Sequence, residues 1–70
     1  MPTISEVAAS IVCRLADVEY IGIQNGFGYI EDMALFKDRV THSTLALPLS
    51  GLTRRAIRVK LKESRERFGL

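Results

Sequence analysis

The sequence contains one cysteine, two prolines and no tryptophan in 70 residues, and it has no long apolar run. One cysteine cannot form an intramolecular disulfide, and with a single histidine it cannot supply the four ligands that zinc prefers. No apolar stretch approaches the ~20 residues that cross a bilayer, and the N-terminus lacks the basic and apolar regions of a secretion signal. We therefore expect a cytoplasmic protein without cofactor, metal or membrane contact.

The length and composition indicate one small globular domain over residues 1–70. Hydrophobic residues make up 47% of the chain, which is enough for one core. A core of this size usually gives only about 3–5 kcal/mol of stability unless staples or oligomerisation add to it. Homodimer formation is therefore one expectation for this chain.

Two segments have helical periodicity. The first runs from about Ile4 to Asp17 behind Thr3 and Glu6, which have the spacing of a capping box. The second follows Thr53, a good N-cap, and ends at Gly69. Its apolar stripe is narrow, which is typical of a helix that lies on a sheet with most of its surface in water. The stripe contains Ile57, Leu61, Ser64 and Phe68.

The segment between the helices predicts three strands. Residues 20–24 and 27–30 flank Asn25-Gly26, the preferred pair for a type I′ turn, so we predict a tight hairpin. The second strand is interrupted at 31–32, where the alternation stops and indicates a bulge, and it resumes over 33–36. The third strand covers 43–47 and ends at Pro48. The expected fold is α+β, in the order α-β-β-β-α, with both helices on one face of a three-stranded antiparallel sheet. The predicted core contains Val7, Ile11, Leu15, Ile21, Ile23, Ile30, Leu35, Leu45, Leu47, Ile57, Leu61 and Phe68.

Positive charge is concentrated in the second helix. Residues 53–70 hold seven Lys and Arg against two Glu, whereas residues 1–52 hold three basic against six acidic residues. At 100° per residue, five of the basic side chains fall between about 60° and 160° from Ile57. They form a predicted partner-binding basic flank made of Arg54, Arg55, Arg58, Lys62 and Arg65. Such a flank suits an acidic protein or a nucleic-acid backbone.

The element order is similar to that of double-stranded-RNA-binding domains, and Arg54-Arg55-Ala56-Ile57-Arg58 resembles the basic cluster that opens their last helix. The resemblance covers element order and three positions. The glycine-proline-histidine loop of that family is absent, and a two-residue Asn25-Gly26 turn is too short to reach a minor groove. The resemblance implies nucleic-acid binding, to RNA in particular, as the alternative function.

Three of the five aromatic residues fall on the outer face of the predicted hairpin. These are Tyr20, Phe27 and Tyr29, opposite the isoleucine face. Large rigid rings on an exposed sheet face are typical of interfaces, so we predict that this face binds a partner or a second copy of the chain.

No residue set supports catalysis. Cys13 is predicted on the polar side of the first helix, and nothing places His42 beside it as a base. Pro2 resembles the catalytic proline of small tautomerases at one residue, but a helix cap follows it here instead of a strand. Glu31, Asp32 and Asp38 lack the spacing of a calcium loop.

The predicted function is a small non-enzymatic interaction module that binds a macromolecule and takes no small-molecule substrate. Free-standing intracellular domains of this size are often phage or mobile-element products, so an inhibitor of host defence, anti-CRISPR-like, is the hypothesis for its biological role.

Overall fold

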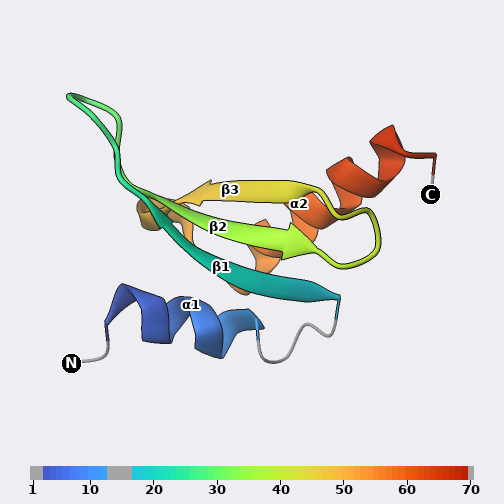
Figure 1. Cartoon of the computed structure of the whole chain (residues 1–70), viewed down its shortest axis with the longest axis horizontal. Coiled ribbons are helices and arrows are strands. Elements are labelled where there is room, and N and C mark those ends of the chain that lie inside the picture. Colours follow the sequence, from blue (N-terminus) through green and yellow to red (C-terminus); the bar gives the residue numbers. More distant parts are fainter. Residues whose placement is uncertain (1–2, 13–16, 70) are drawn as a thin grey trace.

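The structure of the chain is a computed structural model that describes residues 3–12 and 17–69. Helices and strands follow one another in the order α1-β1-β2-β3-α2, as predicted, with a short 3₁₀ helix before α2 (Figure 1). Their bounds are α1 Ile4–Val12, β1 Val18–Gln24, β2 Met33–Asp38, β3 Thr44–Pro48, η1 Leu49–Gly51 and α2 Arg54–Arg67. The fold is a small α+β domain in which α1 contacts β1 and α2 contacts β3.

Both predicted helix starts are confirmed by side-chain hydrogen bonds. The Thr3 amide donates to the Glu6 carboxylate and the Glu6 amide donates to Thr3 Oγ1, each at 3.1 Å, which is a complete capping box. At α2, the Ala56 amide donates to Thr53 Oγ1 at 3.1 Å. Gly69 follows α2 with a φ of 76°, the left-handed conformation that glycine tolerates best.

The first helix is described over a shorter range than predicted. Helix α1 is described from Ile4 to Val12, and Asp17, the predicted last residue, lies in a turn immediately before β1. The Asp17 carbonyl accepts a hydrogen bond from the Arg39 amide at 2.8 Å, so this position joins the sheet end instead of continuing a helix. Cys13 and Leu15 lie outside the described residues.

The predicted Asn25-Gly26 hairpin is also wrong. Gln24 pairs with Met33, so β1 and β2 are joined by a loop over residues 25–32, and residues 27–30 form no strand. The predicted last strand is confirmed, because β3 pairs with β2 in antiparallel register from Lys37 with Thr44 to Met33 with Pro48. Strand β2 is therefore the centre of a β1-β2-β3 sheet.

The register shift lies in β1 and not at residues 31–32. Tyr20 pairs with Phe36 and Gly22 with Leu35, which leaves Ile21 as the extra residue of a bulge. The bulge puts Tyr20 and Ile23 on one face and turns Ile21 outward, where it is 52% exposed. The Tyr20 ring packs against Phe36 with ring centroids 5.6 Å apart.

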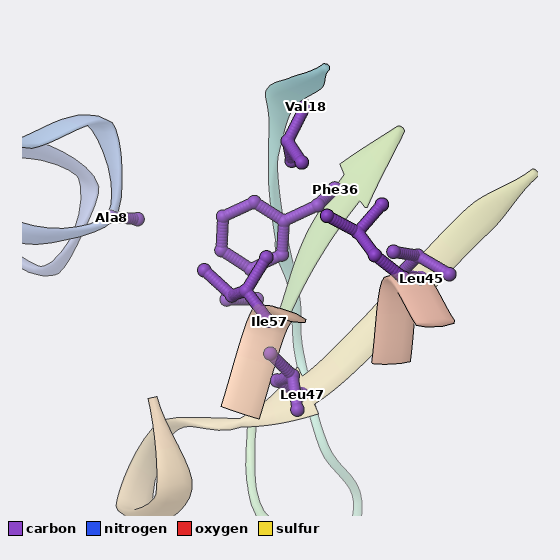
Figure 2. Close-up of a cluster of buried hydrophobic side chains, with 8 residues drawn as sticks. Ala8, Val18, Phe36, Leu45, Leu47 and Ile57 are labelled. Atoms are coloured by element: carbon purple, nitrogen blue, oxygen red, sulfur yellow. The ribbon is translucent and has the colours of Figure 1, made fainter. Parts of the chain in front are cut away.

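One hydrophobic cluster joins the sheet to both helices. Figure 2 shows Phe36 of β2 and Ile57 of α2 pointing toward each other, with Ala8 of α1 pointing toward the same centre. Both helices therefore pack on one face of the sheet, as predicted. The buried members are Ala8, Val18, Ala34, Phe36, Leu45, Leu47, Ile57 and Leu61.

Four predicted core residues lie elsewhere, and the outward-turned Ile21 is one of them. Ile30 is 69% exposed in the loop, and Phe68, the C-cap of α2, is 61% exposed. Leu35 is half-buried on the opposite face of β2 from Phe36. For Leu35 the cause is the misplaced hairpin, which assigned the wrong alternate residues of β2 to the core, because successive strand residues point to opposite faces.

Candidate functional site

The loop over residues 25–32 projects from one end of the sheet, where it forms the extended tip at the upper left of Figure 1. Its base is fixed by hydrogen bonds. The Gly26 amide donates to Asp32 Oδ1 at 2.7 Å, and the Leu49 amide donates to the Asp32 carbonyl at 3.2 Å. The Ser50 hydroxyl donates to Glu31 Oε1 at 2.9 Å. The loop is thus tied to η1 as well as to itself.

Two glycines permit the course of this loop. A Cβ on Gly26 would collide with the backbone carbonyl of Ile30, so only glycine fits where the two loop arms approach. Gly28 has a φ of 65°, in the left-handed region. The Ile30 amide closes the turn by donating to the Phe27 carbonyl at 3.1 Å. The end of the loop therefore has a defined backbone path.

The end of the loop carries large apolar side chains in solvent. Phe27 is 89% exposed and the Tyr29 side chain is fully exposed. Together with Ile30 they form a surface that we call the apolar tip. Phe27 and Tyr29 were predicted on a sheet face with Tyr20. The structure corrects that arrangement, because Tyr20 is half-buried on the core face against Phe36.

The predicted basic flank divides into two parts. Arg54, Arg55, Arg58 and Lys62 are exposed along α2, and we call these four residues the exposed basic surface. Arg54 and Arg55 occupy the first turn of the helix, where the helix dipole disfavours each cation by ~0.3–1 kcal/mol. Within residues 3–12 and 17–69, the ion pairs involve Arg65 and none of these four residues.

Arg65, the fifth predicted residue, is part of an internal ion-pair cluster. Its Nε and Nη2 lie 3.3 Å from the two oxygens of Asp38, and Nη2 is also 3.3 Å from Asp17 Oδ2. Asp38 is fully buried at the end of β2. The cluster therefore links the end of α2 to the β2–β3 turn and to the start of β1.

The same carboxylate organises the β2–β3 turn. Asp38 Oδ1 accepts hydrogen bonds from the Val40 amide at 2.8 Å and the Thr41 amide at 3.4 Å. The Thr41 hydroxyl lies 3.5 Å from the hydroxyl of Ser64, a buried residue of α2. His42 completes the turn with a φ of 62° and is exposed.

These contacts change the ionisation of both partners. Burial by itself would raise the pKa of the Asp38 carboxyl, but the hydrogen bonds from Arg65 and from the Val40 and Thr41 amides outweigh it. The pKa of Asp38 is therefore lowered below its ordinary value. The Asp38 carboxylate in turn raises the pKa of the Arg65 guanidinium. Both groups are charged at neutral pH, and the pair is structural.

The remaining predicted residues do not gather into one site. Glu31 binds Ser50, Asp32 binds Gly26 and Asp38 binds Arg65, so the three carboxylates have separate partners. In the described part of the chain, no group of three His, Cys, Asp or Glu side chains is placed to hold a metal ion. Pro2 and Cys13 lie outside the described residues.

Two features were missed by reasoning from the sequence. The Asp17–Arg65–Asp38 cluster has a signal in the alternation of β2, since Asp38 shares the face of Ala34 and Phe36 and needs a buried cation there. The apolar tip has a weaker signal. Asp32 lies six residues after Gly26, so its carboxylate can accept the Gly26 amide and close a loop longer than a two-residue turn.

Comparisons with protein-family models, with curated proteins and with solved structures found no match to this chain. Among the described residues, neither helix has the length and apolar character needed to cross a membrane.

Proposed function

We propose that this chain is a non-enzymatic interaction module that binds another protein through the apolar tip. The observation that carries the proposal is the exposure of Phe27 and Tyr29 on a loop whose base is held by hydrogen bonds. Exposed aromatic residues are enriched in the energetic centres of protein interfaces.

The hydrogen bonds that hold the loop over residues 25–32 also favour binding. A loop that already holds its bound conformation loses less conformational entropy on association, which raises affinity without new contacts. Asp32 and Gly26 hold the two arms of the loop together, and Glu31 ties one arm to Ser50 of η1. Phe27 and Tyr29 add rigid rings with few rotatable bonds, which suits them as anchors in a pocket of the partner.

Photo-crosslinking identifies the partner and tests the site together. p-Benzoylphenylalanine is placed at Phe27 or at Tyr29 in cells that carry the gene, and at Val59 as the control, since Val59 is 50% exposed on the separate helix α2. We expect positions 27 and 29 to give the same crosslinked protein and position 59 not to give it. Products that are equal at all three positions would overturn the proposal.

The purified partner then gives a quantitative test. The double variant Phe27→Ala/Tyr29→Ala should bind at least about 30-fold more weakly, because anchor residues typically contribute about 2 kcal/mol or more each. Val59→Ala should bind as the unchanged protein does. Circular dichroism should show the same fold in all three, since none of these side chains is buried.

Sedimentation distinguishes a second copy from a different protein. If the partner is the chain itself, the unchanged protein sediments as a dimer and the double variant as a monomer. A monomer in both cases, with the crosslinked product retained, means that the partner is another protein. A role as a phage or mobile-element inhibitor of host defence is part of the proposal and depends on which protein is found.

A further inference from the structure

A second surface, separate from the apolar tip, carries uncompensated positive charge along α2. The exposed basic surface spans Arg54 to Lys62 within one continuous helix. Arg65 is not part of this surface, because it forms ion pairs with both Asp17 and Asp38. The other four have no carboxylate partner among the described residues.

Five of the six acidic side chains in residues 1–52 have partners elsewhere. Three of them hold backbone or hydroxyl donors, and two hold Arg65. These residues are Glu6 at Thr3, Glu31 at Ser50, Asp32 at Gly26, and Asp17 and Asp38 at Arg65. Most of the negative charge in residues 1–52 is thus not directed at the exposed basic surface.

Three of the four cations form a regular row along α2. Arg54, Arg58 and Lys62 are separated by four residues each, so they form a row along one side of α2. At about 1.5 Å per residue the row is about 12 Å long. One strand of a duplex presents a phosphate about every 3.4 Å along its axis, so the row covers about three phosphates. Placing three cations at this spacing disfavours the isolated helix, because like charges four residues apart repel one another.

The occupant that fits best is a duplex rather than a single strand. Surfaces that bind single strands combine basic residues with aromatic rings on which bases stack, and α2 contains no aromatic residue. A helix is rigid over this length, as is the backbone of a duplex. We infer that the exposed basic surface binds the phosphate backbone of a nucleic acid duplex.

Fluorescence anisotropy with labelled 20-base-pair RNA and DNA duplexes tests the inference on the full chain. Affinity should fall with salt between 50 and 200 mM with a log–log slope of about −3 to −4, which corresponds to four phosphate contacts. The variant Arg54→Glu/Arg58→Glu should bind at least about 10-fold more weakly, with a slope smaller by about 2. The matched control Lys60→Glu/Arg67→Glu removes the same charge from the other side of α2 and should change affinity by less than about 3-fold.

Parallel measurements separate the other anionic partners. The single strand of the same sequence, vesicles of phosphatidylglycerol and a polyglutamate peptide should each bind more weakly than the duplex. Equal loss of binding in the two double variants would mean that only net charge matters and would overturn the assigned surface. Stronger binding of any other probe, or binding that does not respond to salt, would overturn the assigned ligand. Circular dichroism checks that both variants keep the fold, and since neither touches Phe27 or Tyr29, the crosslinking test of the apolar tip remains independent.

Discussion

In both connections between strands an aspartate accepts backbone amides, but one connection projects into solvent and the other is part of the core. In the β1–β2 loop, Asp32 accepts the Gly26 amide and holds a projecting tip of exposed apolar side chains. In the β2–β3 turn, Asp38 accepts the Val40 and Thr41 amides and is fully buried. The two connections lie at opposite ends of the sheet (Figure 1).

The difference lies in what else the carboxylate binds. Asp38 also takes the Arg65 guanidinium, so its turn is joined to α2 and becomes part of the packed domain. Asp32 is half-buried and has no cation from a helix among its described contacts, so its loop stays outside the core. A short loop held by an aspartate is therefore structural or available for binding according to its tertiary partner.

The largest effect is expected from removing the buried carboxylate. Asp38→Ala should lower the free energy of unfolding by about 3 kcal/mol, because it leaves two amides without their acceptor and the Arg65 guanidinium with Asp17 alone. Asp32→Ala should cost only about 1 kcal/mol, since it removes one hydrogen bond in a half-buried position. Urea unfolding followed by circular dichroism measures both.

Asp38→Asn separates charge from hydrogen bonding, because the amide oxygen can still accept from Val40 and Thr41. We expect it to be less stable than the unchanged protein and more stable than Asp38→Ala. If Asp38→Ala leaves no folded protein, Asp38→Asn supplies the comparison with Asp32→Ala. Equal costs at positions 38 and 32 would contradict the distinction between the two connections.

The pH dependence of stability should be tied to the β2–β3 turn. The pKa of Asp38 is lower in the folded protein than in the unfolded chain, so its contribution is complete above the unfolded value of about 3.9 and is lost as the pH falls toward the folded value. Within that window the loss is at most about 1.4 kcal/mol per pH unit.

Urea midpoints from pH 8 to pH 2, at constant ionic strength, measure this effect. The difference between the unchanged protein and Asp38→Asn should be constant from pH 8 to pH 5 and shrink only at more acid pH. A difference that changes between pH 5 and pH 8 would show that another group controls it.

A smaller and local effect is expected in the β1–β2 loop. Gly26→Ala places a Cβ against the Ile30 carbonyl, so the loop arms must separate and the unfolding free energy should fall by about 1 kcal/mol. Gly22→Ala is the matched control, because a Cβ there meets nothing within 4 Å. Hydrogen exchange at the Gly26 and Ile30 amides should accelerate in the first variant alone, while amides of β2 keep their protection. Unchanged exchange in Gly26→Ala would show that the loop is not held at this contact.

Local chemistry was enough to predict the helix starts. Thr3 with Glu6 and Thr53 with Ala56 are neighbours in the chain, so their hydrogen bonds depend on spacing alone. The order of elements and the pairing of β3 onto β2 were also predictable, because hydrophobic alternation and Pro48 mark that strand. The exposed positions of Arg54, Arg55, Arg58 and Lys62 followed from helical periodicity.

The sheet register was not predictable in the same way. The Asn25-Gly26 pair favours a two-residue turn, but pairing Gln24 with Met33 lets β1 take its place beside the whole of β2. That choice, with the bulge at Ile21, packs Tyr20 against the buried Phe36 and leaves the apolar residues of the loop outside. The energy that decides it comes from packing across the sheet and helices, which no local signal contains.

By itself, the sequence determined which segments are helices, the order of the strands and the concentration of positive charge in the last helix, because each depends on residues that are close together in the chain. Only the tertiary structure decided that Arg65 is withdrawn from that basic flank into a cluster with Asp17 and Asp38, and that Phe27 and Tyr29 stand on a projecting loop. These outcomes depend on contacts between residues far apart in the chain, where burial of a carboxylate requires a cation and burial of a ring requires a packed neighbour.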